Sequence, residues 1–381
     1  MIIGFVILWY GLVPIAGALV TRYKWRRFRQ RFDELRLRPL LDYSLYRQIG
    51  EEGGSFRFMG GFESVTDGQT LWIKGENMTI PVSLTNAQTF FLPMTESEKI
   101  PESFDPGDEA PERIRWDRIS TLTEGARVFI GGSLVYQDGR WIFVSTREHP
   151  LLVIFYDGSD RSLTARTIRA GRRRNEYWNA VTPYSLAIGV LCQLLIAISF
   201  LSRPAFRLTV VTALSALFTP LFPLIPPGLL FTVVYRRLSW RARILRAYHD
   251  LIRLPLRYFA PEKISDRKTC RLPNGELYGC IYYESLPPAV REQNIPILLP
   301  EYSIRDLSGG GYIVGALSPE SELPVEPQDT AASFGILPPH PEALARRYAI
   351  TAYMLEAAAW IALLAGIGLN IFFLRMLLSL L

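Results

Sequence analysis

The 381-residue sequence has few of the residues from which metal sites and catalytic sites are most often built. It contains three histidines and three cysteines, which are too few for two zinc sites and too scattered for a disulfide framework. The histidines have no serine, cysteine or carboxylate at motif spacing, and no glycine-rich phosphate-binding loop occurs. The sequence therefore predicts no catalytic residue, no metal site and no cofactor, and it favours a protein without enzymatic activity.

Charged residues are missing from long stretches of the chain, and hydrophobic residues, 49% of the total, gather there in blocks. About 20 apolar residues in a helix cross the ~30 Å hydrocarbon core of a bilayer. The blocks predict four α-helical membrane spans, at residues 1–21, 183–201, 208–235 and 349–374. A cleaved signal peptide is the alternative for the first block, since Ala16-Gly17-Ala18 suits cleavage, but arginines follow this block instead of preceding it.

The third block contains four prolines and cannot be one straight helix. They are Pro220, Pro223, Pro226 and Pro227. One kinked span, and a helix to about Leu221 followed by an irregular piece and a short helix, are both compatible with this pattern inside the membrane. Irregular backbone at that depth has to be buried in protein or line a cavity, so the prolines are candidates for an intramembrane site.

Two basic arms, at residues 22–42 and 236–258, each follow an apolar block and end in Pro-Leu. Each carries a tryptophan among its arginines, Trp25 in the first arm and Trp240 in the second. By the positive-inside rule the arms are cytoplasmic and the N-terminus is outside, as in a multi-pass protein of the bacterial inner membrane. Because the basic residues lie beside apolar blocks, they indicate a membrane surface and not a nucleic acid as the partner.

The juxtamembrane basic residues are expected either to bind anionic lipid headgroups or only to fix the topology. They are Arg22, Lys24, Arg26, Arg27, Arg29, Arg172, Arg173, Arg174, Arg236, Arg237, Arg241 and Arg243.

Residues 43–181 predict a first soluble domain of the all-β class, with six or seven short strands in a small barrel or sandwich. The turns Thr66-Asp67-Gly68 and Gln137-Asp138-Gly139 are hairpin signals, since glycine readily adopts the positive φ that such turns need. Between the strands, residues 95–113 are acidic and rich in proline and are predicted to be a linker.

Residues 261–345 predict a second β domain that repeats the first in shortened form. Residues 276–285 follow an Asn274-Gly275 turn, residues 294–304 match the strand at Met78–Leu84, and residues 309–317 match the later glycine-containing strand. The shared order of these segments predicts a tandem duplication. The second copy has more proline and fewer strands, so it is not expected to close a barrel.

The order of features over residues 2–201 resembles the GIDE, or beside-a-membrane, domain of membrane-anchored ubiquitin ligases. The matching stretches are residues 60–65, 80–84 and 125–131 and the hairpin at residues 137–139. Val82 departs from the family pattern, in which this position is aromatic, and the chain has no RING. The resemblance therefore implies a membrane-proximal β domain without ligase activity.

Glu356 lies about two turns inside the last span, and an ionisable residue there is a candidate ion or proton site. The alternative is an ion pair with an arginine such as Arg346 or Arg347. Cys270 and Cys280 flank the Asn274-Gly275 turn, where they could form a redox pair or remain separate thiols.

These features favour a non-catalytic scaffold or assembly factor whose membrane-proximal β domains bind a protein partner or a second copy of the chain. A transporter or channel component that uses the proline-broken block and Glu356 is the alternative. A lipid-handling enzyme is a third possibility for which the sequence identifies no residues.

Overall fold

The computed structural model divides the chain into two compact units. The first consists of Met1–Arg27, Arg173–Arg246 and Ala349–Leu381, and the second of Phe28–Arg172 and Ala247–Tyr348. The structure describes residues 2–50, 53–66, 69–92, 112–113, 119, 126–137, 139–147, 150–158, 160–169, 178–259, 267–286, 288–292, 295–299, 302, 305, 307, 309–318, 323–330 and 332–379.

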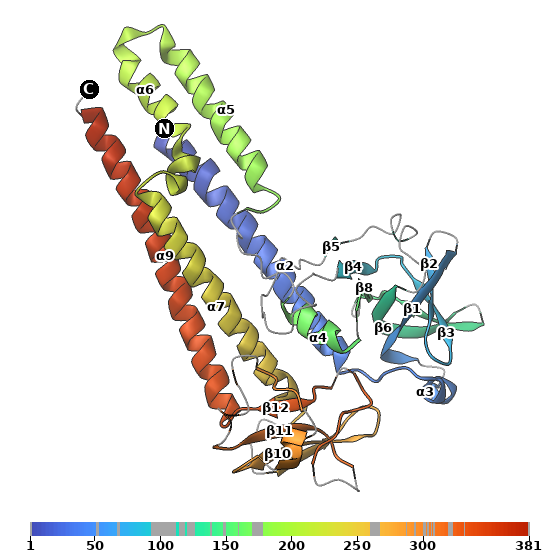
Figure 1. The fold of residues 1–381 in the computed structure, drawn as a ribbon. Helices are drawn as coiled ribbons and strands as arrows, with labels where there is room; N and C mark the ends of the chain where they lie inside the picture. The colour runs from blue at the N-terminus through green and yellow to red at the C-terminus, as the bar shows by residue number, and fades with distance from the viewer. Residues whose placement is uncertain are drawn as a thin grey trace. The chain divides into compact units, whose positions relative to one another are not determined.

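Three helices are long and apolar enough to cross a membrane, at Ile2–Arg36, Thr182–Leu201 and Pro341–Met376. They coincide with the first, second and fourth predicted spans and indicate a membrane protein. In Figure 1 they are drawn as α1 (Ile2–Val6), the π-helical turn η1 (Ile7–Leu12), α2 (Val13–Arg36), α5 (Thr182–Leu201) and α9 (Pro341–Ser379).

The third apolar block is broken, which was one of the two predicted alternatives. It begins with α6 (Arg207–Ala216), continues as the 3-10 turn η5 (Thr219–Leu224), and passes through a cis Pro226-Pro227 bond into α7 (Gly228–Leu256). Figure 1 shows α6 antiparallel to α5, to which it is connected by η4 (Pro204–Phe206). Because the block is divided between shorter pieces, a fourth complete span stays a prediction.

Within the first unit, α5 binds a backbone carbonyl that Pro14 leaves without its donor. In the π-helical turn the N–H of Val13 donates to the carbonyl of Leu8, five residues earlier. The next bond in this register would come from Pro14, which has no N–H, so the carbonyl of Trp9 needs another donor. The hydroxyl of Ser185 on α5 supplies it.

The two helices approach closely on either side of this contact. The amide of Asn179 donates to the carbonyl of Pro14 at 3.0 Å, before α5 begins. At Gly189 a Cβ atom would lie 2.3 Å from the ring of Tyr10, so a larger residue would push the helices apart. Small residues and polar side chains of this kind hold helices together in membranes, where lipid competes for apolar surface.

In the second unit the first sheet closes on itself. Strand order is β1-β2-β3-β7-β6, and β6 pairs again with β1, so five strands form a ring. All ring pairings are antiparallel except β3 with β7, where Val82 lies opposite Phe143. This is the strand order of the five-stranded OB-type barrel.

The barrel forms because each strand directs apolar residues inward. Leu71, Ile73, Val82, Val128 and Phe143 are buried in its core. Strands β8, β4 and β5 extend the sheet beyond β6. The strands of this sheet are β1 (Gly54–Thr66), β2 (Thr70–Lys74), β3 (Thr79–Ser83), β4 (Gln88–Leu92), β5 (Glu112–Arg113), β6 (Arg127–Gln137), β7 (Arg140–Val144) and β8 (Leu152–Tyr156).

The prediction of six or seven short strands is close to the eight that the structure describes, of which β5 was not predicted. Gly139 has φ of +79°, as the predicted hairpin turn requires, whereas Asp67, Gly68 and Asp138 lie outside the described residues. The predicted linker is described only at its end, where Glu112–Arg113 form β5 against β4. Two short helices, α3 (Tyr43–Gln48) and α4 (Asp160–Arg169), precede and follow the barrel strands.

The second sheet has four antiparallel strands in the order β12-β11-β10-β9, and these pairings do not close into a ring. The strands are β9 (Arg267–Arg271), β10 (Leu277–Tyr283), β11 (Gly311–Ala316) and β12 (Gly335–Leu337), and α8 (Pro288–Glu292) lies between β10 and β11.

The prediction for this domain is confirmed for β10 and β11. Residues 294–304 are described only at 295–299 and 302, where Ile297 forms a single bridge to Ile336, and a strand over the whole segment stays a prediction. Neither β9 nor β12 was predicted. The two sheets differ in closure and strand number, and the tandem duplication stays a prediction.

Replacing Ser185 by alanine should weaken the packing of the first span on α5, because the carbonyl of Trp9 would lose its donor in an apolar environment. The free energy of unfolding should fall by about 0.6 kcal/mol, and by no more than ~2 kcal/mol. Unfolding in mixed micelles with increasing SDS measures this change. Ser199 on the same helix is the matched control, because its hydroxyl bonds only within α5, to the carbonyl of Leu195. Equal losses for both alanine variants would contradict the interhelical role of Ser185.

Candidate functional site

Glu356 on α9 is held by one arginine from each basic arm. Its Oε1 accepts a hydrogen bond from Arg22 on α2 at 2.7 Å, and its Oε2 accepts one from Arg246 on α7. The predicted ion pair with an arginine is confirmed, but the partners are not Arg346 or Arg347. They lie nine or ten residues earlier on the same helix, roughly 15 Å along its axis and beyond the reach of the side chains.

The pairing explains how α9 can carry a carboxylate within its apolar segment. The Glu356 side chain is only 17% exposed, and an isolated ionised carboxylate in such a place would lose its hydration without compensation. Here each carboxylate oxygen has its own guanidinium, so both acceptors are satisfied.

The basic arms are continuations of the membrane helices, since α2 extends to Arg36 and α7 to Leu256. Most of the predicted basic residues are on their surface. Lys24, Arg26, Arg27, Arg236, Arg237 and Arg241 are exposed, Arg22 and Arg29 are half-buried, Arg243 is buried, and Arg172, Arg173 and Arg174 lie outside the described residues.

The proline-broken segment is packed on α9 at a different place. The amide of Asn370 donates to the carbonyl of Ile225, directly before the Pro226-Pro227 bond, at 3.0 Å. Pro223 lies in the 3-10 turn η5. Asn370 is about 14 residues after Glu356 on α9, or roughly 21 Å along the helix, so the two predicted intramembrane features do not form one site.

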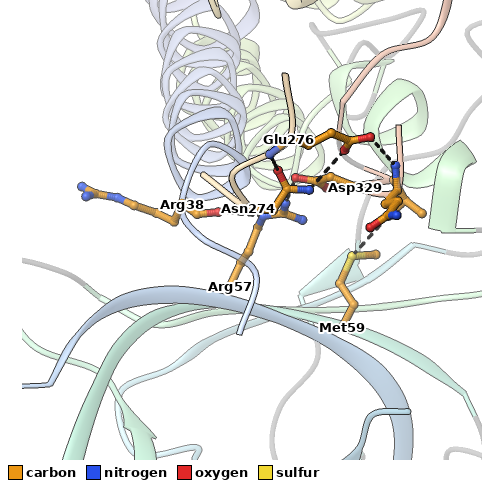
Figure 2. A network of polar contacts seen from close by, with 8 residues as sticks. Arg38, Arg57, Met59, Asn274, Glu276 and Asp329 are labelled. Carbon is orange, nitrogen blue, oxygen red and sulfur yellow. Dashed lines mark hydrogen bonds and ion pairs between the residues drawn. The ribbon is translucent and has the colours of Figure 1, made fainter. Parts of the chain in front are cut away.

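In the second unit, a buried ion pair connects the barrel to the second β domain (Figure 2). Arg57 on β1 pairs with Asp329, and their side chains are 1% and 4% exposed. The Nε of Arg57 also donates to the carbonyl of Arg38 at 2.8 Å. The backbone of Arg57 bonds to that of Pro39 and Leu41, so the end of the first arm lies against β1.

Polar contacts from the second domain surround this pair. Figure 2 shows Asn274 and Glu276 beside Asp329, where Nδ2 of Asn274 donates to Glu276 at 3.2 Å. Glu276 also accepts from the backbone N–H of Gln328 at 3.3 Å. The predicted Asn274-Gly275 turn therefore helps to hold the loop that carries Asp329.

Sequence reasoning missed Arg57 and Asp329. The signal at Arg57 was a single arginine between the apolar residues Phe56 and Phe58 of β1. Such a residue needs a buried partner unless the strand face is open to solvent. Asp329 offered no comparable signal, because it lies in a loop.

The cysteines do not form a redox pair in the structure. Cys270 is opposite Tyr278 in the β9–β10 ladder and Cys280 is opposite Lys268, so the two thiols are diagonal neighbours, and both are free. Desolvation by burial raises the pKa of Cys270 to about 11 and that of Cys280 to about 12. Within the part of the chain that the structure describes, no group of three or more His, Cys, Asp or Glu side chains could hold a metal ion.

Two aromatic contacts, on opposite faces of the strands, lie at the β6–β7 hairpin of the barrel. Tyr136 and Trp141 contact each other edge-on with ring centroids 5.3 Å apart. The guanidinium of Arg140 lies over the ring of Trp72, 5.3 Å from its centroid. Tyr136 is 57% exposed, and the neighbouring Val135 is also on the surface. We call these five residues the hairpin cluster; the sequence analysis did not single it out.

Replacing Asp329 by asparagine should destabilise the second unit by about 3–5 kcal/mol, because Arg57 would keep a buried charge without a counter-ion. The measurement is chemical unfolding of the full chain in detergent. Replacing both Arg57 and Asp329 by leucine should restore much of the lost stability. The control is Asp33→Asn, which removes the more exposed pair with Arg257 and should cost about 1 kcal/mol or less. Equal losses of stability in Asp329→Asn and Asp33→Asn would contradict the view that burial makes the pair of Arg57 and Asp329 costly to break.

The cysteines should react slowly with iodoacetamide at pH 8, because thiols with pKa values near 11 and 12 are almost fully protonated there. Unfolding in SDS returns both to a pKa of about 8.5, so labelling at pH 8 should accelerate at least tenfold. Mass spectrometry of peptides containing Cys270 and Cys280 separates the two sites. Rapid labelling of folded Cys280 would contradict its burial.

No family model matches this chain, and no curated protein or solved structure matches it either. The resemblance to the beside-a-membrane domain therefore stays a prediction, and the site has to be interpreted from its own geometry.

Proposed function

We propose that this protein is a non-catalytic membrane scaffold whose β domains bind a protein partner. The observation that carries the proposal is the hairpin cluster. Tyrosine, tryptophan and arginine are the residues most enriched among those that dominate binding energy at protein interfaces. Tyr136 is exposed and is braced by Trp141, so it can be buried by a partner with little loss of conformational entropy.

The place of the cluster on the barrel also supports binding. In OB-type barrels, ligands contact the face of the second and third strands and the loop between the fourth and fifth strands. Here the corresponding elements are β2, which carries Trp72, and the β6–β7 hairpin, which carries Tyr136 and Arg140. This is an analogy between folds and does not identify the ligand.

The membrane orientation is part of the same proposal. We infer that the arms and the β domains are cytoplasmic and the N-terminus is outside, in a bacterial inner membrane, because arginines follow the first apolar segment. A membrane-proximal β domain without ligase chemistry is also what the resemblance to the beside-a-membrane domain implies. The partner is then a cytoplasmic or membrane protein, or a second copy of this chain.

Transport remains the competing proposal, with Glu356 and the broken third block as its pathway. The geometry supports it less. Both oxygens of Glu356 are bound by arginines, and the break near Pro226 is roughly 21 Å away along α9. An ion pathway through both features would have to release Glu356 from two guanidinium groups.

The Tyr136→Ala variant should lose at least tenfold in affinity for the partner, because truncation of a central interface tyrosine commonly costs 2 kcal/mol or more. The partner is first identified by purification from detergent-solubilised membranes, and the affinity is then measured with the purified pair. Tyr43→Ala is the matched control, since Tyr43 is also an exposed tyrosine with an arginine over its ring, but lies on α3.

Glu356→Gln should leave the partner affinity unchanged under the scaffold proposal. Complementation of a deletion strain by the same variants separates the two functions. Loss of function in Glu356→Gln with normal function in Tyr136→Ala would reject the scaffold and favour transport. Purification of the protein alone, with no stoichiometric partner and no self-association, would also count against the scaffold.

A further inference from the structure

Arg140 is the member of the hairpin cluster that carries a charge. It is exposed, and its guanidinium lies over the ring of Trp72, 5.3 Å from the centroid. In the part of the chain that the structure describes, its side chain forms no ion pair and no hydrogen bond. A cation–π contact uses the positive charge of a guanidinium and leaves its N–H donors for another group. Arg140 therefore has the charge and the donors to bind an anion.

Trp72 and Arg140 form a fixed platform on the outer face of the barrel. Leu71 and Phe143 point into the barrel core, so alternation along β2 and β7 places Trp72 on the outer face. The same alternation places Arg140 there. Strand β3 lies between β2 and β7, and their contact crosses it at Pro81, which is opposite Trp72 and buried. A guanidinium held in this way loses little conformational entropy when it binds a partner.

The charges on this face favour an acidic ligand. Lys74 is exposed and lies two residues after Trp72 on β2, so it shares the outer face. Like Arg140, it forms no ion pair within the described part of the chain. Glu63, where the pairing of β1 with β2 is irregular, is the one acidic residue in the five ring strands, and it pairs with neither of them. The outer face thus offers two basic groups that are not neutralised.

A carboxylate suits this face better than a nucleic acid does. Single-stranded nucleic acids are bound by aromatic rings on which successive bases stack. Strands β2, β3 and β7 carry one aromatic residue on their outer face, Trp72, and Arg140 already contacts its ring. A carboxylate can instead accept two parallel hydrogen bonds from one guanidinium. Val135, opposite Ile142 and 39% exposed, lies on the same face and offers an apolar contact beside Arg140.

We propose that the partner binds this outer face through an acidic segment. An aspartate or glutamate carboxylate of the partner binds Arg140, and a neighbouring apolar side chain packs on Val135. Trp72 positions the guanidinium, and Lys74 attracts the same segment by its charge. The inference rests on the proposed function, since it specifies the chemistry of the partner that the hairpin cluster binds.

The test selects short random peptides, displayed on phage, on the full-length protein in detergent micelles. The selected peptides are synthesised, and their affinities are measured by fluorescence anisotropy. They should share an aspartate or glutamate, and Arg140→Gln should weaken their binding about tenfold or more, as when one partner of a hydrogen-bonded charge pair is removed from an interface. Arg140→Lys should give an intermediate affinity, because lysine keeps the charge and lacks the planar pair of donors.

The matched control is Arg47→Gln. Arg47 is also exposed, and its guanidinium lies 5.7 Å from the ring centroid of Tyr43, on α3. Both variants lose the same charge and the same kind of contact, so a general charge effect would weaken the binding of peptides equally. Equal losses in Arg140→Gln and Arg47→Gln would overturn the proposal.

A second measurement leaves the protein unchanged and replaces the acidic residue of the peptide by its amide. This replacement should weaken binding to the native protein and have little further effect on Arg140→Gln, because the two changes remove the same interaction. Independent, additive losses would overturn the proposal. A single-stranded oligothymidine that binds the native protein and loses affinity in Arg140→Gln would also overturn it, since the occupant would then be a nucleic acid.

The same peptides separate failure of this inference from failure of the proposed function. Peptides that lose affinity in Tyr136→Ala but not in Arg140→Gln, or that lack an acidic residue, would overturn the inference and leave the hairpin cluster a protein-binding site. If no selected peptide responds to Tyr136→Ala or to Arg140→Gln, both the inference and the proposed function are rejected.

Discussion

A charge or hydrogen-bonding group that is removed from water needs a partner, and the structure depends on how this chain meets that constraint. Arg57 and Asp329 satisfy it inside the second unit, where they connect the two β domains. Glu356 satisfies it in the first unit through two arginines. The same requirement fixes part of the backbone, because the carbonyl of Trp9, which Pro14 leaves without its donor, is bound by Ser185 of α5. On α9, Asn370 adds a second hydrogen bond to the carbonyl of Ile225, which also accepts from the N–H of Leu229. Apolar packing fills the space between these contacts, while the polar contacts decide which helix lies against which.

The partners in these contacts come from opposite ends of the chain. Arg22 and Glu356 are 334 residues apart, and Arg57 and Asp329 are 272 residues apart. Each compact unit is accordingly assembled from separate stretches of sequence. An individual β domain excised at its sequence boundaries would therefore expose Arg57 or Asp329 without its counter-ion. The soluble part behaves as one unit with two sheets, where the sequence pattern alone suggested two independent domains.

The features that could be predicted from the sequence are those that depend on residues close together in the chain. Most strands of the first sheet and three apolar helices were predictable, because alternation, turn glycines and hydropathy are local signals. Those local signals do not predict that β1 pairs with β6 and closes the ring. Strand β9 was missed because its basic residues hide any alternation of apolar and polar residues, and β12 was missed because it has only three residues. The ion pair of Glu356 with an arginine was predictable, but Arg22 and Arg246 were not, because they are distant from Glu356 in sequence. The hairpin cluster was missed because Trp72 and Arg140 meet only after the barrel has folded.

The distance between Arg57 and Asp329 along the chain also sets a delay during synthesis. At roughly 5 to 20 residues per second, the ribosome needs about 15 to 50 s to add the 272 residues that separate them. Once Val144 has been added the barrel strands are complete, while the guanidinium of Arg57 still has no counter-ion. The barrel must therefore keep this side of β1 in contact with water, and it closes against the second domain only once synthesis is nearly finished.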